Sequence, residues 1–200
     1  MTASTIKSRP IYPGLSPDLN ARRNIIVCDK AGAEAVAELF SRADSAFAER
    51  TTVILADSLS DTESKTLGRD LAPATIEIQP SLAVGITRLR QLLEAAPMGL
   101  RLYAAGSEPL IGLVVQAGLD FSIDHLSIRT EHRGSLKRRV QCVHCKGYME
   151  NVTTSPVKCT HCGLTLFVRD HYSRRLAAFQ GVCVDAEVPG EIPPTEALYQ

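Results

Sequence analysis

The amino-acid sequence predicts an α/β protein in two parts, a parallel sheet covered by helices and a small cysteine-rich β module. Strand-like and helix-like segments alternate through roughly the first two thirds of the chain, which is the pattern of a parallel sheet with helices on both faces. The composition changes at Arg129, and two Cys-x-x-Cys pairs follow. With 200 residues, 44% hydrophobic and 22% charged, the chain can build one ordinary domain and a small satellite.

Short apolar runs alternate with segments of helical periodicity, and Asp29 and Ser81 are positioned to cap two of the helices. In chain order, the pattern predicts a strand over 24–28, a helix over about 30–48, a strand over 52–56, a polar stretch over 57–70, a strand over 75–78, a helix that begins after Ser81 and ends before Pro97, a strand over 100–104, a helix over 107–116 and an extended piece over 125–129.

Changes in composition divide the chain into four segments. Six basic residues and one acid lie between Arg129 and Lys146, and residues 183–200 carry four acids, three prolines and no Lys or Arg. We therefore expect a flexible N-terminal arm over 1–20, an α/β domain over 21–133, a four-cysteine zinc ribbon over 134–182 and an acidic, proline-containing tail over 183–200.

Composition also argues against several functions. Lys and Arg together number 22, as do Asp and Glu, and only 5% of the residues are aromatic, so binding to nucleic acid is disfavoured. The sequence shows neither an apolar run long enough for a membrane span nor a secretory signal, which predicts a cytoplasmic protein with no membrane partner. Its cysteines are then expected to be reduced rather than paired in disulfides.

The four clustered cysteines are the strongest signal. Cys142-x-x-Cys145 and Cys159-x-x-Cys162 are separated by thirteen residues, and Gly147 and Gly163 stand where such turns need positive φ. Four thiolates complete a tetrahedron and leave no open position, so the pattern predicts a structural zinc site, with iron in the same ligands as the alternative. His144 and His161 occupy matching positions inside the pairs, where a role beside the metal or at the surface is favoured over ligation.

The turn after the first predicted strand does not fit a dinucleotide. Glycine-rich phosphate turns follow G-x-G-x-x-G, whereas this turn has Gly32 alone, and Asp29 would repel a phosphate. Cys28 and Cys183, outside the cluster, are expected to be buried and inert. No complete active site is evident, and we predict no catalytic and no cofactor-binding residue in this chain.

Basic and apolar residues near the C-terminus form a candidate surface for a partner protein. The acidic tail cannot build a core alone, so it is expected to lie against another subunit or against the basic run Lys137-Arg138-Arg139. The predicted partner-binding residues are Arg169, His171, Tyr172, Arg174, Arg175, Leu198 and Tyr199.

Two segments resemble known families. The first is Leu102-Tyr103-Ala104-Ala105-Gly106-Ser107-Glu108-Pro109-Leu110, with Val114, Val115 and Gly118. It resembles the end of the NAD(P)-binding domain of ferredoxin-reductase-type flavoproteins, although Ala105 stands where those proteins have cysteine. The resemblance implies a Rossmann-like N-terminal domain that has lost its nucleotide fingerprint.

The C-terminal third, from Cys142 to Tyr199, resembles the small metal-ribbon subunit of bacterial dimethylamine monooxygenases. The matching residues are the two Cys-x-His-Cys pairs, 168–175, 179–182, 189–191 and 196–199. The resemblance implies an NADPH-dependent complex that oxidatively demethylates secondary amines, in which this chain docks a haem-binding catalytic subunit and a flavin and iron–sulfur reductase subunit. Haem, FMN, [2Fe–2S] and NADPH are then expected on those partner subunits only.

Three functions therefore remain open at the level of sequence. The first is a non-catalytic, zinc-binding accessory subunit of that monooxygenase. The second is a rubredoxin-like electron carrier with iron in the four-cysteine site. The third, disfavoured by the neutral net charge, is a nucleic-acid-binding zinc ribbon.

Overall fold

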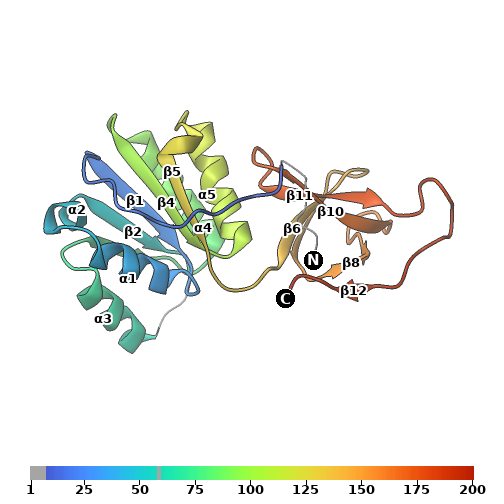
Figure 1. Ribbon diagram of the computed structural model, residues 1–200, viewed down its shortest axis with the longest axis horizontal. Helices are drawn as coiled ribbons and strands as arrows, with labels where there is room; N and C mark the ends of the chain where they lie inside the picture. The colour runs from blue at the N-terminus through green and yellow to red at the C-terminus, as the bar shows by residue number, and fades with distance from the viewer. Residues whose placement is uncertain (1–7, 58–59) are drawn as a thin grey trace. The chain divides into compact units, whose positions relative to one another are not determined.

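The computed structural model describes residues 8–57 and 60–200, and it divides the chain into two compact units (Figure 1). The first unit comprises Tyr12–Gly134. The second comprises Ser135–Gln200 together with residues 8–11. The described residues include no helix that has both the length and the apolar character to cross a membrane.

A five-stranded parallel sheet forms the centre of the first unit. Its order is β3-β2-β1-β4-β5, and each neighbouring pair is parallel. The strands are β1 (Arg23–Cys28), β2 (Thr51–Leu55), β3 (Thr75–Ile78), β4 (Leu100–Gly106) and β5 (Ile128–His132). Every residue of β2 is buried and β1 is buried from its second residue on, as expected for central strands covered on both faces.

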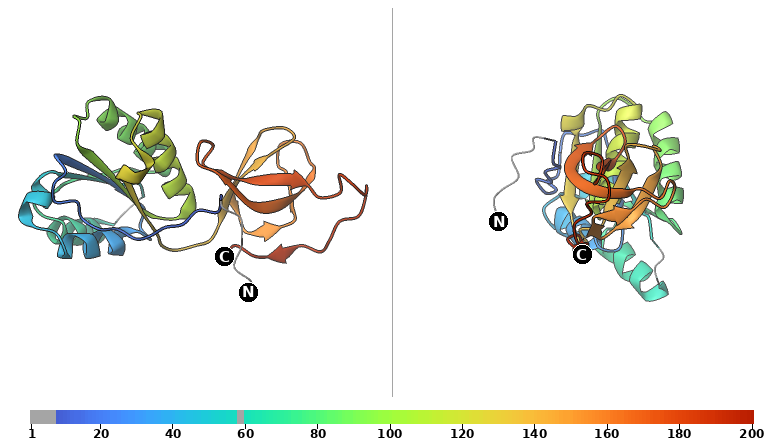
Figure 2. Two further views of the ribbon diagram at one scale, coloured as in Figure 1. Left: turned by 45° about the horizontal axis from the view of Figure 1, so that its top comes forward. Right: turned by 90° about the vertical axis from the view of Figure 1, so that its right-hand side faces the viewer.

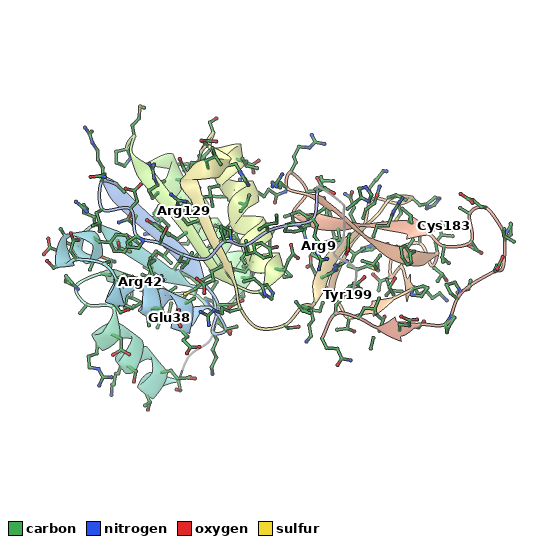
Figure 3. The ribbon with its side chains drawn as sticks, in the orientation of Figure 1. Arg9, Glu38, Arg42, Arg129, Cys183 and Tyr199 are labelled. Atoms are coloured by element: carbon green, nitrogen blue, oxygen red, sulfur yellow. The ribbon has the colours of Figure 1, made fainter. Side chains whose placement is uncertain are left out.

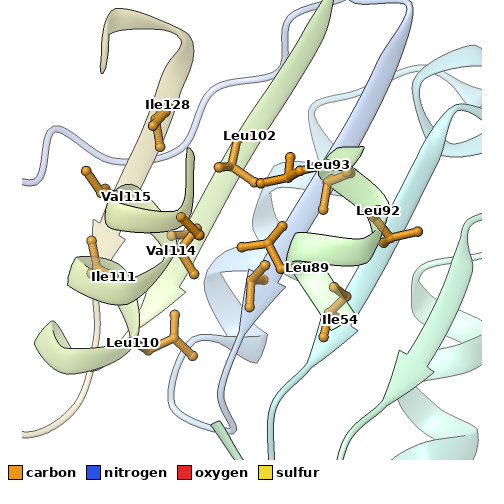
Figure 4. Packing of buried hydrophobic residues seen from close by; sticks show 14 of the residues in the cluster. Ile54, Leu89, Leu92, Leu93, Leu102, Leu110, Ile111, Val114, Val115 and Ile128 are labelled. Atoms are coloured by element: carbon orange, nitrogen blue, oxygen red, sulfur yellow. The ribbon is translucent and has the colours of Figure 1, made fainter. Parts of the chain in front are cut away.

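Helices cover both faces of this sheet. They are α1 (Ala33–Ser41), α2 (Ser45–Glu49), α3 (Asp61–Asp70), α4 (Leu82–Glu94) and α5 (Glu108–Asp120), followed by the 3₁₀ turn η1 (His125–Ser127). One core cluster joins α4 and α5 to the sheet through Leu89, Ile111 and Leu102 (Figure 4). A second cluster joins α1 and α2 to the opposite face through Leu39 and Phe47. The predicted parallel sheet with two helical layers is therefore confirmed.

Two predicted segments differ from the structure. The helix predicted over 30–48 is divided, because the side chain of Asp44 accepts a hydrogen bond from the N–H of Phe47 and begins α2. The polar stretch predicted over 57–70 contains α3. Its start carries a capping box, in which Ser60 and Glu63 exchange side-chain to backbone hydrogen bonds. The sequence signal for this helix is the Ser-x-x-Glu pattern, in which Ser60 and Glu63 stand three positions apart.

The N-terminal arm predicted to be flexible over 1–20 is ordered from Tyr12 onward. Leu15 is only 3% exposed and joins the second core cluster, and its N–H donates to a carboxylate oxygen of Glu131 (2.9 Å). The N–H of Asp18 donates to the hydroxyl of Tyr103 (3.0 Å). The arm is held because one apolar side chain and several backbone donors find partners on the sheet. Residues 1–7 lie outside the described part.

The second unit is built on a mixed five-stranded sheet of order β7-β6-β11-β10-β9. Figure 2 shows its strands in orange to red. Its strands are β6 (Arg138–Cys142), β7 (Tyr148–Val152), β9 (Val157–Lys158), β10 (Thr165–Ser173) and β11 (Ala178–Cys183). A two-stranded sheet joins β8 (Thr154–Ser155) to β12 (Glu196–Ala197). The end of the predicted tail is therefore a part of this unit and not a separate segment.

Candidate metal centre

Each Cys-x-x-Cys pair lies in a tight turn, and the two turns have the same geometry. In the first, the N–H of Lys146 donates to the carbonyl of Cys142 (2.9 Å); in the second, the N–H of Gly163 donates to the carbonyl of Cys159 (3.0 Å). Lys146 and Gly163 both stand four residues after the first cysteine, with φ of 63° and 79°. The two pairs are thus two copies of one local structure.

Gly147 has a different role from the one predicted. The positive φ of the first turn falls on Lys146, and a Cβ at Gly147 would lie 2.5 Å from Cδ2 of the His161 ring. The glycine therefore makes room for that ring. Nε2 of His161 lies 2.8 Å from the carbonyl oxygen of Tyr148, to which it donates a hydrogen bond when it carries the proton. His161 stands beside the cluster, and His144 is exposed.

The four thiols converge on one point. Their Sγ atoms all lie within 4.8 Å of one another, and the distances Cys142–Cys162 and Cys145–Cys159 are both 3.8 Å. These distances exclude disulfides, in which the sulfurs are about 2.05 Å apart. A tetrahedral ion with ligands at about 2.3 Å has sulfur–sulfur edges of about 3.8 Å. The spacing therefore fits a four-thiolate metal site.

Burial and hydrogen bonding make the thiols unequal. Burial raises the pKa of Cys159. Hydrogen bonds from the N–H groups of Cys162 and His161 and from the neighbouring thiols outweigh this effect and lower the pKa to about 6. At Cys162 the N–H of Leu164 lowers the pKa, but burial and the three neighbouring thiols outweigh it and raise the pKa to about 12. Because a metal binds the thiolate form, binding at this cluster must release the protons that the thiols carry.

The two remaining cysteines take no part in the cluster. Cys28 is fully buried in β1, and burial with the nearby charge of Asp29 raises its pKa to about 12. Cys183 is only half-buried, contrary to the prediction, because it ends β11 at the edge of the unit (Figure 3). Its Sγ donates to a carboxylate oxygen of Asp185 (3.1 Å), which raises the pKa of the thiol.

The predicted partner-binding residues differ in their exposure. Four are exposed, two on β10 and two in the turn to β11: Arg169, His171, Arg174 and Arg175. Tyr172 instead turns toward the core and packs edge-on against Phe179, with ring centroids 4.9 Å apart. Strand alternation explains the division, because successive side chains of β10 point to opposite faces.

The C-terminal residues are held inside the second unit. The guanidinium of Arg138 lies 4.0 Å from the ring centroids of both Phe179 and Tyr199, and it donates to Asp170 (2.7 Å). Tyr199 is only 9% exposed, and its hydroxyl donates to the carbonyl of Val168 (3.3 Å; Figure 3). Tyr199 is therefore no exposed plug for a partner, which corrects the prediction. Leu198 is 46% exposed.

The edge of the parallel sheet where β1 and β4 end is filled by the chain itself. Doubly wound sheets bind ligands in this crevice, with anions at a helix N-terminus. Here the carboxylate of Asp29 accepts hydrogen bonds from the N–H of Gly32 (3.0 Å) and from the N–H and hydroxyl of Ser107 (2.9 and 2.7 Å). A Cβ at Gly32 would lie 2.1 Å from the carbonyl oxygen of Ala105. The donors of Gly32 and Ser107 are therefore already hydrogen-bonded to a carboxylate of the same chain.

Comparison with known proteins gives matches over most of the chain. Residues 4–128 match the family described as dimethylamine monooxygenase subunit DmmA-like, N-terminal domain, and residues 139–182 match the corresponding C-terminal domain. A heme-dependent oxidative N-demethylase delta subunit from Ectopseudomonas mendocina (strain ymp) is 39% identical over 114 residues. The aligned segment covers 55% of this chain and 63% of that subunit, which is less than two thirds of its length.

Proposed function

Because the chain belongs to the dimethylamine monooxygenase subunit DmmA-like family, we propose that it is a metal-binding accessory subunit of a haem-dependent complex that oxidatively demethylates a secondary amine. The observation that carries the proposal is the four-thiol cluster, whose spacing fits a closed metal site. The related delta subunit is named as a subunit of a heme-dependent oxidative N-demethylase.

Zinc is the proposed metal. Four thiolates at tetrahedral spacing suit it, and they leave no position for water or substrate, so the ion would stabilise the second unit and perform no hydrolysis. Two small sheets bury little apolar surface, so the binding free energy of such an ion would add substantially to the stability of the unit. The exposure of Cys145 supports iron as the second candidate, because an exposed ligand is accessible to an electron-transfer partner.

The first unit is proposed as a Rossmann-like domain that no longer holds a nucleotide. Its strand order β3-β2-β1-β4-β5 is that of the first five strands of a doubly wound dinucleotide-binding sheet. The carboxylate of Asp29 occupies the donors that would hold a pyrophosphate. NADPH, FMN, the [2Fe–2S] cluster and haem are accordingly assigned to a reductase subunit and a haem-binding catalytic subunit, which this chain docks.

Two measurements test this function. Elemental analysis of the purified chain should find about one zinc per chain, with no visible absorption; one iron per chain with a coloured Fe(III)–thiolate band would replace the accessory role by the electron-carrier role. Amine-dependent NADPH oxidation by the haem and reductase subunits should require this chain. Full activity without it would refute the accessory role.

A further inference from the structure

One side of the second unit's large sheet presents an exposed aromatic ring between cationic side chains. Along β10, Leu166 and Val168 lie in the core cluster, whereas Phe167, Arg169 and His171 are exposed. The register between β10 and β11 shifts between Val168 and Tyr172, so Arg169 and His171 stand on an irregular part of the strand. Phe167 is 47% exposed. A single exposed ring is ordinary at a protein surface, so the candidate contact rests on this ring together with the side chains around it.

Neighbouring strands extend this face. Val182 of β11 lies directly opposite Phe167, and Lys158 of β9 lies opposite Thr165, so both side chains are on the same side of the sheet as Phe167. Val182 adds apolar surface beside the ring, and Lys158 adds a cation at the edge. We call these residues the β10 face: Lys158, Phe167, Arg169, His171 and Val182.

Within the described part of the chain, the cations of the β10 face have no acidic partner. Among residues 8–57 and 60–200, Lys158, Arg169 and His171 form no ion pair. Near Tyr148, on the same side of the sheet, the carboxylate of Glu150 is already paired with Arg139 (2.7 Å). The nearest acid in the sequence, Asp170, points to the other side and is held by Arg138. Two permanent cations around an apolar centre are complementary to a surface with carboxylates around an apolar contact.

We propose that the β10 face binds an acidic, partly apolar protein surface on another subunit of the demethylase complex. This inference rests on the function proposed above and goes beyond it by naming the contact. A protein is favoured over nucleic acid because the chain has no net charge and, among the described residues of this face, Phe167 is the one ring that is exposed. The ring of Tyr148, on the same side of the sheet, is covered by the guanidinium of Arg139 at 4.1 Å.

The test uses the full, metal-loaded chain and the separately purified haem and reductase subunits. Phe167→Ser and Arg169→Glu are made singly, with Lys65→Glu as the control, because Lys65 is an exposed cation on α3 in the other unit. Dissociation constants are measured at low and high salt for each subunit. Metal content and the thermal midpoint verify that each variant remains folded, which is expected because both replaced side chains are exposed.

The proposal expects each β10 variant to weaken binding to one subunit by at least about tenfold, with Lys65→Glu unchanged. Wild-type affinity should fall as salt rises, and Arg169→Glu should reduce that dependence. If both variants bind as tightly as wild type, the proposed role of the β10 face in binding is refuted, while the accessory function stands. If wild type binds neither subunit, the accessory function itself fails. Micromolar binding of a DNA or RNA oligonucleotide that is lost in both variants would also overturn the proposal.

Discussion

Replacement of Tyr199 by alanine should destabilise the second unit, although the residue is next to the C-terminus. The ring is 9% exposed, stacks on the guanidinium of Arg138 at 4.0 Å and donates through its hydroxyl to the carbonyl of Val168. Stacking contributes about 0.5–2 kcal/mol, the hydrogen bond about 1 kcal/mol, and the lost apolar burial adds to both. Because a chain end can relax, we expect a total of about 2–4 kcal/mol, slightly below the cost at a core aromatic.

Two further variants separate the contribution of the Tyr199 hydroxyl from that of its ring and provide an exposed control. Tyr199→Phe removes only the hydroxyl and should cost about 0.5–1 kcal/mol. Leu198→Ala, at the exposed neighbouring position, should cost less than about 0.5 kcal/mol. Release of the metal during urea unfolding, followed with a chromogenic chelator, reports on the second unit alone. The reasoning is wrong if Tyr199→Ala is as stable as Leu198→Ala, or if Tyr199→Phe loses as much as Tyr199→Ala.

Three other changes have definite expected results. Cys142→Ser should abolish stoichiometric metal binding in elemental analysis, whereas Cys183→Ser, outside the cluster, should retain it. Gly32→Ala should lower the thermal midpoint of the first unit, by calorimetry, because its Cβ would overlap a main-chain carbonyl of β4; an unchanged midpoint would show that the turn can move. The two hydrogen bonds from Arg88 hold the pKa of Glu77 below its usual value, so this pair adds stability above about pH 4.5 that is lost as the pH falls through the folded-state pKa. Arg88→Ala should therefore be less stable than wild type at pH 7, with the difference shrinking toward pH 3 in denaturant titrations.

The sequence alone was sufficient for features set by short stretches of chain. The spacing of Cys142 with Cys145 and of Cys159 with Cys162 fixes two identical turns, so the four-thiol cluster followed directly from it. The alternation of buried strands with helices likewise determined the parallel sheet. Both are local signals, in which the residues that carry the pattern also make the structure.

Tertiary structure decided which side chains are free to act. On β10 a shift of one residue exchanges the faces, so only the pairing with β11 exposes Phe167 and packs Tyr172 against Phe179. The sequence marked Leu198 and Tyr199 alike as partner contacts, yet the pairing of β12 with β8 places Tyr199 against Arg138 and leaves Leu198 at the surface. Asp29 meets Ser107 only because β1 and β4 are neighbours. These outcomes depend on contacts between distant segments, which no local pattern specifies.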